Sequence, residues 1–163
     1  MKHLYLVRHA EACEQGANGR DFDRPLSANG KEDASQMGQR LSQWPKPEVM
    51  LSSSAIRAKT TANLLATAIE YPQSEIIFEE QIYEAELENL LSVIRAVYKE
   101  AVCVMLVGHN PALTQLVTML GGGTAHMPTC SMALLQIPSN SWGDIDHMTA
   151  ELINFDYPSK VAE

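Results

Sequence analysis

The sequence has few cysteines, few aromatic residues and no long apolar run. Its three cysteines, Cys13, Cys103 and Cys130, are widely spaced among 163 residues and match no disulfide framework or zinc-ligand spacing. The longest apolar stretch, residues 101–108, has the length of a strand and falls short of the ~18 residues of a membrane span. The apolar stretch after Met1 is also too short for a signal peptide. We therefore predict a cytoplasmic protein with no membrane partner.

Basic residues are also scarce, because 12 Lys and Arg stand against 20 Asp and Glu and give a formal net charge of −8. Proteins that bind nucleic acid use lysine and arginine to neutralise phosphates, so we predict no nucleic-acid partner. A few arginines that converge in a cleft can still bind a single anion on an acidic protein.

The remaining composition is that of an ordinary globular chain, with 45% hydrophobic and 20% charged residues. A chain of this length usually forms one domain. We predict a single domain over residues 1–157 and a frayed C-terminal tail at 158–163.

Strand-like and helix-like segments alternate along the chain. Apolar runs predict strands at 4–7, 49–52, 76–78, 102–107, 131–137 and 150–155, with a polar turn at 140–146 between the last two. Apolar residues at three-and-four spacing predict helices at 30–44, 54–69, 87–98 and 110–120. This order predicts a single three-layer α/β/α sandwich, with a mostly parallel central sheet and helices on both faces.

Local signals predict where these helices begin and end. Pro45 and Pro47 are expected to end the first helix. One of the serines at 52–54 is expected to cap the second, and Asn110 to cap the fourth, with Pro111 as its first residue. The glycines from position 121 are expected to stop that fourth helix.

Basic and imidazole side chains follow three of the predicted strands. Arg8 and His9 follow the first strand, Arg57 lies one helical turn after the second, and His109 follows the strand at 102–107. Ligands of open α/β sheets bind beyond the carboxyl ends of the strands, and neighbouring strands lie ~4.8 Å apart. We therefore expect these four side chains to meet in one pocket. No carboxylate holds an equivalent place directly after these strands.

Two arginines and two histidines at one site favour phosphoryl transfer. The planar fork of arginine binds two phosphate oxygens at once. A histidine that attacks phosphorus must be neutral, and a guanidinium at ~4 Å favours that state by at most about 4 kcal/mol at an effective dielectric constant of ~20. We interpret His9 as the nucleophile, Arg8 and Arg57 as phosphoryl-binding groups, and His109 as a group that stabilises charge on the equatorial oxygens. Each residue taken singly also fits an ordinary structural role.

A metal site at His9 and His109 is disfavoured, because no carboxylate accompanies the two rings and the nearby arginines would repel a cation. We predict a reaction that needs neither metal nor cofactor.

Four short motifs occur in order between residues 4 and about 120. They are Leu6-Val7-Arg8-His9-Ala10-Glu11, Arg24-Pro25-Leu26-Ser27 with Gly30, residues 52–62 around Arg57, and Val107-Gly108-His109-Asn110-Pro111. Together they resemble the motifs of the histidine phosphatase superfamily, whose members are phosphoglycerate mutase-like. Within it the chain is most similar to the small SixA-type phosphohistidine phosphatases.

The resemblance implies the α/β sandwich of that family without a cap domain. It implies that His9 is the phosphorylated nucleophile and that Arg8, Arg57 and His109 complete the phosphate pocket. It also implies that Arg24 reaches the rim of that pocket as a further substrate-binding residue.

The chain departs from the family pattern in four respects, one of which is Ser54 where the family often has proline. Ala10 stands where the family usually has glycine, which is tolerable if the backbone there needs no positive φ. The motif typical of mutases is absent, which counts against a mutase. Only 25 residues separate Arg57 from Tyr83, which leaves no room for the lid that many members with small-molecule substrates use.

A general acid is not evident from the sequence. Hydrolysis of a phosphate ester expels an alkoxide that needs a proton, whereas phosphohistidine can expel neutral imidazole. Glu84 is the best candidate acid, but Glu84 and Glu86 also fit a role as carboxylates at a helix N-terminus.

Because the sequence does not identify a general acid, three functions remain as alternatives. The first is a phosphatase for phosphohistidine on a protein, whose protruding side chain suits a site without a lid. The second is a small-molecule phosphomonoesterase that uses Glu84 as its acid. The third is a regulatory module that binds phosphate without turnover.

Overall fold

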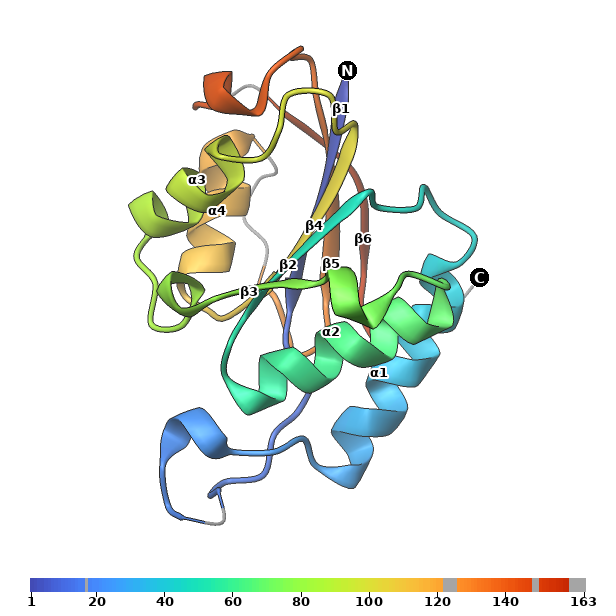
Figure 1. Cartoon of the computed structure of the whole chain (residues 1–163), viewed down its shortest axis with the longest axis vertical. Coiled ribbons are helices and arrows are strands. Elements are labelled where there is room, and N and C mark those ends of the chain that lie inside the picture. Colours follow the sequence, from blue (N-terminus) through green and yellow to red (C-terminus); the bar gives the residue numbers. More distant parts are fainter. Residues whose placement is uncertain (17, 122–125, 148–149, 159–163) are drawn as a thin grey trace.

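The computed structural model describes residues 1–16, 18–121, 126–147 and 150–158. Within them one sheet has the strand order β3-β2-β4-β1-β5-β6 (Figure 1). The strands are Lys2–Arg8 (β1), Val49–Ser53 (β2), Ile77–Glu79 (β3), Cys103–Gly108 (β4), Met132–Ile137 (β5) and Glu151–Asp156 (β6). Strands β3, β2, β4 and β1 pair in parallel, whereas β5 is antiparallel to β1 and to β6. The prediction of a mostly parallel sheet is confirmed.

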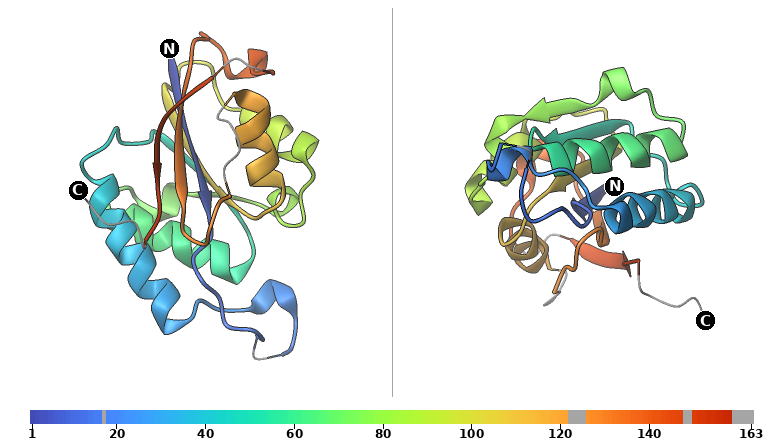
Figure 2. Two further views of the ribbon diagram at one scale, coloured as in Figure 1. Left: turned by 180° about the vertical axis from the view of Figure 1, so that it is seen from behind. Right: turned by 90° about the horizontal axis from the view of Figure 1, so that it is seen from below.

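Helices cover both faces of this sheet (Figure 2). They are Ala28–Leu41 (α1), Ile56–Ala68 (α2), Leu87–Arg95 (α3) and Ala112–Leu120 (α4), with short 3-10 helices at Asp21–Asp23 (η1), Gln73–Glu75 (η2), Glu80–Ile82 (η3) and Trp142–Asp144 (η4). Helices α1 and α2 pack on one face, and α3 and α4 pack on the other. The predicted three-layer α/β/α sandwich is confirmed, and it carries no cap domain in the described residues.

Strand β1 shows how the sheet is buried from both sides. Leu4 and Leu6 belong to the apolar cluster under α3 and α4, whereas Tyr5 and Val7 belong to the cluster under α1 and α2. Successive side chains of a strand point to opposite faces, so each face buries two apolar residues of this strand. Burial of a side chain of this size stabilises the fold by about 1.5–3 kcal/mol. Strand β1, which ends at Arg8 beside His9, is therefore held from both faces of the sheet.

Three helix starts differ from the prediction, and α1 begins at Ala28 instead of Gly30. Helix α2 begins after Ala55 rather than after one of the serines at 52–54, because β2 continues through Ser53. The hydroxyl of Ser53 instead accepts a hydrogen bond from the Ala55 amide at 3.1 Å. Helix α4 begins after Pro111, so Asn110 is not its N-cap. The side-chain amide of Asn110 instead donates to the Met127 carbonyl at 3.1 Å.

Two helix ends also differ. Helix α1 ends at Leu41, before the predicted end at Trp44, and α3 ends at Arg95 rather than Tyr98. Trp44 and Tyr98 are 42% and 55% exposed, so their apolar spacing continues the helical pattern without packing onto the sheet. Helix α4 does stop at a glycine, because Gly121 adopts a left-handed φ of 113°.

The predicted polar turn at 140–146 contains a fully buried residue. Trp142 begins η4, and its indole donates a hydrogen bond to the Ala101 carbonyl at 2.8 Å. The connection between β5 and β6 therefore closes the α3 and α4 side of the core, and its description as merely polar was wrong.

Of the tail at 158–163, residues 159–163 lie outside the described residues. The Pro158 carbonyl accepts a hydrogen bond from Arg40 at 3.4 Å. No helix in the described part of the chain is long and apolar enough to cross a membrane.

Gly30 fixes the connection between β1 and α1. A Cβ at this position would lie 2.0 Å from the Glu11 carbonyl oxygen, which also accepts a hydrogen bond from the Ser27 amide at 3.0 Å. Glu11 lies two residues after His9, so the first turn of α1 packs directly on the segment that carries this histidine.

We expect Gly30→Ala to lower the free energy of unfolding by about 1–3 kcal/mol, because backbone atoms must move to accommodate the methyl group. The exposed neighbour Lys31→Ala is the control and should change it by less than about 0.5 kcal/mol. Urea denaturation of both variants measures the difference. Equal stability of the two variants would show that the contact at Gly30 does not constrain the fold.

Candidate active site

The four residues predicted from the strand ends do converge. Arg8 is the last residue of β1 and His9 follows it, His109 follows β4, and Arg57 lies in the first turn of α2 after β2. Strands β2, β4 and β1 are neighbours in the sheet, which brings these side chains to one edge. The ring centroids of His9 and His109 lie 5.0 Å apart, with the ring planes at 52°.

His9 is held in one tautomer. Its Nδ1 lies 2.7 Å from the Ala10 carbonyl oxygen. A carbonyl can only accept a hydrogen bond, so Nδ1 carries the proton and Nε2 keeps its lone pair. The Ala10 amide donates to the Thr61 hydroxyl at 2.9 Å, and this hydroxyl donates to the Arg57 carbonyl at 2.8 Å. Ala10 does not adopt a positive φ, so alanine meets no backbone strain where the family usually has glycine.

Both imidazoles are neutral at pH 7. Burial is the largest cause that lowers the pKa of His9 to about 4, and the charges of Arg57, Arg8 and Arg24 lower it further. Burial likewise lowers the pKa of His109 to about 3, with contributions from His9 and Arg57. The guanidinium charges were predicted to keep His9 neutral, whereas burial of the ring has the larger effect on its pKa.

His109 contacts a serine and a tyrosine. Its Nε2 lies 2.8 Å from the hydroxyl of Ser53, the last residue of β2. The ring of Tyr83 meets the imidazole edge-on, with centroids 5.6 Å apart. The imidazole is therefore fixed from two sides, by β2 and by the segment before α3.

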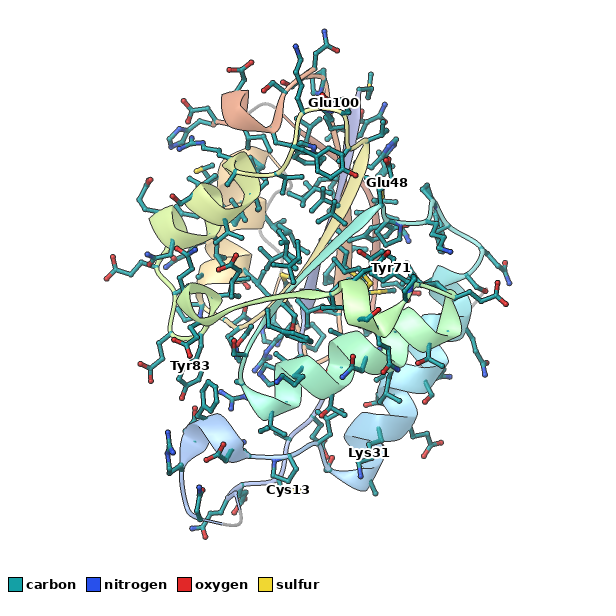
Figure 3. The ribbon with its side chains drawn as sticks, in the orientation of Figure 1. Cys13, Lys31, Glu48, Tyr71, Tyr83 and Glu100 are labelled. Carbon is teal, nitrogen blue, oxygen red and sulfur yellow. The ribbon has the colours of Figure 1, made fainter. Side chains whose placement is uncertain are left out.

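Asp21 is a site residue that the sequence argument missed. Its carbonyl oxygen accepts from Arg57 Nη1 at 2.7 Å, and its Oδ2 accepts from Arg57 Nη2 at 3.0 Å and from the Tyr83 hydroxyl at 2.7 Å. Figure 1 shows η1, in the loop between β1 and α1, below the end of the sheet. Figure 3 shows Tyr83 on the segment above η1. Asp21 reaches the site from the loop between β1 and α1, so the positions of the strand ends could not indicate it. The sequence feature that could have indicated Asp21 is its position three residues before Arg24.

Arg24 touches the site through Asp21. Its Nη1 donates to Asp21 Oδ1 at 3.0 Å, and its Nε donates to the Cys13 carbonyl at 2.7 Å. Arg24 is thus placed on the outer side of the Asp21 carboxylate, and its predicted role at the pocket rim stays a prediction.

The two carboxylates before α3 differ in position. Glu86 is the N-cap of α3 and forms a capping box with Asn89, so the helix-start interpretation is confirmed for Glu86. Glu84 is exposed, adopts a φ of 52° and directly follows Tyr83. The pKa of Tyr83 is raised mainly by burial, then by Asp21, and to a smaller extent by the charge of Glu84. Its predicted role as the general acid stays a prediction.

Unsatisfied buried polar atoms concentrate at this site. Among the described residues, buried side-chain nitrogen or oxygen atoms without a partner are Arg8 Nε, Arg57 Nε, His109 Nδ1 and Ser131 Oγ. Such atoms are rare in folded proteins and often mark a place where a ligand binds. The first three belong to residues predicted to hold a phosphoryl group.

The described residues contain no group of three or more His, Cys, Asp or Glu side chains that could hold a metal ion. Two cavities, of about 310 and 470 Å³, lie elsewhere, at the C-terminal ends of α1 and α2 and between β3 and α3. The predicted catalytic side chains line neither cavity.

Comparison with known proteins agrees with this geometry. The family model of the histidine phosphatase superfamily (branch 1) matches residues 4–91, which is just over half of the chain. An uncharacterised chloroplastic protein of Arabidopsis thaliana is 31% identical over 153 residues, which cover 86% of this chain and 69% of the plant protein.

Two solved structures are similar over almost their whole length. A protein of Nakamurella multipartitia assigned as the phosphohistidine phosphatase SixA has a TM-score of 0.85 and 26% identity, and the match covers 98% of this chain and 97% of that chain. A protein of Agrobacterium tumefaciens with the same assignment has a TM-score of 0.80 and 30% identity, covering 96% and 98%.

The lowered pKa values of His9 and His109 predict a loss of stability in mild acid. Between pH 6.5 and about 4 the unfolded chain binds protons that the folded rings do not, so the free energy of unfolding falls as the pH falls. Each ring contributes at most about 1.4 kcal/mol per pH unit. Urea denaturation at several pH values measures the slope.

His109→Gln should make this slope shallower, whereas His126→Gln, which removes an exposed histidine, should leave it unchanged. An identical slope in the wild type and His109→Gln would show that His109 is not held neutral.

Proposed function

The chain belongs to the histidine phosphatase superfamily and is a phosphatase, and we propose that its substrate is phosphohistidine on a protein and that His9 is its nucleophile. The observation that carries the proposal is the neutral His9 ring, which keeps the lone pair on Nε2 while Nδ1 donates to the Ala10 carbonyl. The positive charges of Arg8 and Arg57 act on the His9 ring and lower its pKa.

The proposed reaction has two displacements at phosphorus. In the first, Nε2 of His9 forms a bond to phosphorus while the bond from phosphorus to the substrate imidazole breaks and its electron pair leaves with that nitrogen. In the second, water attacks the phosphohistidine, the bond to Nε2 breaks, the electron pair returns to Nε2, and the water protons leave with phosphate. Arg8, Arg57 and His109 would stabilise the charge on the phosphoryl oxygens.

Two considerations favour phosphohistidine over an ester. A substrate imidazole with a proton on its other nitrogen leaves as a neutral group and needs no general acid. The chain between Arg57 and Tyr83 consists of α2, η2, β3 and η3, so this segment does not form a lid. An open site admits a side chain that protrudes from a folded protein. The two relatives of known structure that are assigned as phosphohistidine phosphatases support the same substrate.

Metal independence is part of the proposal. Two guanidinium groups beside His9 provide the positive charge that a metal ion supplies in other phosphatases, and their charge would repel a cation. Cytoplasmic location and the absence of a nucleic-acid partner stay predictions from the sequence.

The first prediction of this proposal is a covalent intermediate. The protein reacts with a phosphohistidine peptide that carries labelled phosphate, and the reaction is then quenched rapidly. The wild-type protein should retain label that is stable in base and labile in acid, whereas His9→Ala should retain none. His126→Ala, which removes an exposed histidine, is the control and should be labelled like the wild type. Turnover without any trapped label would contradict the role of His9, and phosphate binding without turnover would indicate a binding module instead.

The second prediction separates the two enzymatic functions. If phosphohistidine is the substrate, Glu84→Gln should change its hydrolysis by less than about 3-fold, because neutral imidazole needs no proton from the enzyme. A general acid contributes at least about 100-fold, so a loss of that size on an alkyl phosphate with a poor leaving group would favour the small-molecule function. The exposed Glu88→Gln is the control. Steady-state rates on both substrates provide the measurement.

A further inference from the structure

We propose that Asp21 is the positioning residue of Arg57, because it binds the outer edge of the guanidinium and leaves the Nε edge for the phosphoryl group. The inference rests on the proposed function, since it assigns the geometry of the same site. Arg57 is a buried cation, with 7% of its side chain exposed. Both terminal nitrogens donate to Asp21, Nη1 to the carbonyl oxygen at 2.7 Å and Nη2 to Oδ2 at 3.0 Å.

A guanidinium offers two edges for paired hydrogen bonds. One edge is formed by Nη1 and Nη2, and the other by Nε and the neighbouring Nη. Asp21 occupies the first edge. The Nε of the second edge is buried and has no partner in the described structure. An oxygen of a phosphoryl group would satisfy it, and the Asp21 contacts fix the rotation of the guanidinium that presents this edge.

Asp21 is itself held from two directions. Its Oδ1 accepts from Arg24 at 3.0 Å, and its Oδ2 accepts from the Tyr83 hydroxyl at 2.7 Å. Arg24 is anchored to the Cys13 carbonyl, and the ring of Tyr83 packs edge-on against Phe22 with centroids 5.0 Å apart. The carboxylate therefore joins the loop between β1 and α1, the start of α2 and the segment before α3.

The contacts exclude Asp21 as a proton donor. The Tyr83 hydroxyl is the largest influence that holds the pKa of this carboxyl far below its usual range, and Arg24 and Arg57 act in the same direction. The carboxylate stays ionised at any pH at which the enzyme works, so it acts through Arg57 rather than on the substrate.

The same contacts allow one opposing interpretation, in which Asp21 is an internal anion that substrate must displace. The backbone carbonyl argues against it, because rotation of the Asp21 side chain cannot release its bond to Nη1, so a substrate that displaced only the carboxylate would leave Arg57 bound to η1. The two interpretations predict opposite changes in anion affinity when the carboxylate is removed.

The experiment compares Asp21→Ala with Asp23→Ala in the full chain. Asp23 lies in the same short helix but contacts Asn18 and Arg20 instead, so its loss removes an equal charge from the same segment. The probe is inorganic phosphate, measured by calorimetry and as a competitive inhibitor of phosphohistidine-peptide hydrolysis. We expect Asp21→Ala to weaken phosphate binding and lower kcat/KM by about 10–100-fold, the range that loss of a supporting partner causes at metal sites. Asp23→Ala should change either by less than about 2-fold.

A second measurement separates positioning from general stability. Because Asp21 acts through Arg57, Asp21→Ala should have little further effect on phosphate affinity in an Arg57→Ala background. Tyr83→Phe keeps Asp21 and its bonds to Arg57 but removes one bond to Oδ2, so it should shift phosphate affinity in the same direction by about 3-fold. This variant remains informative if Asp21→Ala does not fold.

The outcomes that would overturn the inference are distinct. Tighter phosphate binding by Asp21→Ala would show that the carboxylate competes with substrate. Effects equal to those of Asp23→Ala, or a full additional loss in the Arg57→Ala background, would show that Asp21 does not act through Arg57. A wild-type protein that neither binds phosphate nor hydrolyses the peptide would overturn the proposed function, and this inference with it.

Discussion

The hydrogen bond between His9 Nδ1 and the Ala10 carbonyl is the interaction on which the proposed chemistry depends. It places the proton on one nitrogen of a buried ring and leaves the lone pair on the other. Strand β1 ends at Arg8, so His9 and Ala10 lie outside the strand. The backbone of His9 is nevertheless hydrogen-bonded to neighbouring elements. The His9 amide donates to the Gly108 carbonyl at 3.1 Å, and the Cys130 amide donates to the His9 carbonyl at 3.0 Å.

The parts of the site that the sequence predicted are those fixed by strand order. Arg8, His9 and His109 follow buried apolar runs, and the carboxyl ends of parallel strands meet at one edge. Periodicity located these strand ends, and the adjacency of β4 and β1 in the sheet brings them together. Asp21 could not be found in this way, because it lies on a loop whose path depends on tertiary contacts with Arg57 and Tyr83.

The errors at helix starts have a related cause. Ser53 and Asn110 have the chemistry of N-caps, but their side chains bind Ala55, His109 and Met127 in the folded chain. Local propensity could not show these competing partners. The cause of the neutral His9 was misjudged for a similar reason, since the degree of burial of one ring depends on the packing of several elements around it.

The segment between Ala12 and Leu26 leaves and rejoins the fold at a single isolated β-bridge. It supplies Asp21 and Arg24, yet its removal would break no pairing between the strands of the sheet. Doubling the length of such a loop costs only about 0.6 kcal/mol in closure entropy. A change in the length or sequence of this segment would therefore alter the groups around the proposed phosphate site and leave the strand that ends beside His9 paired as before.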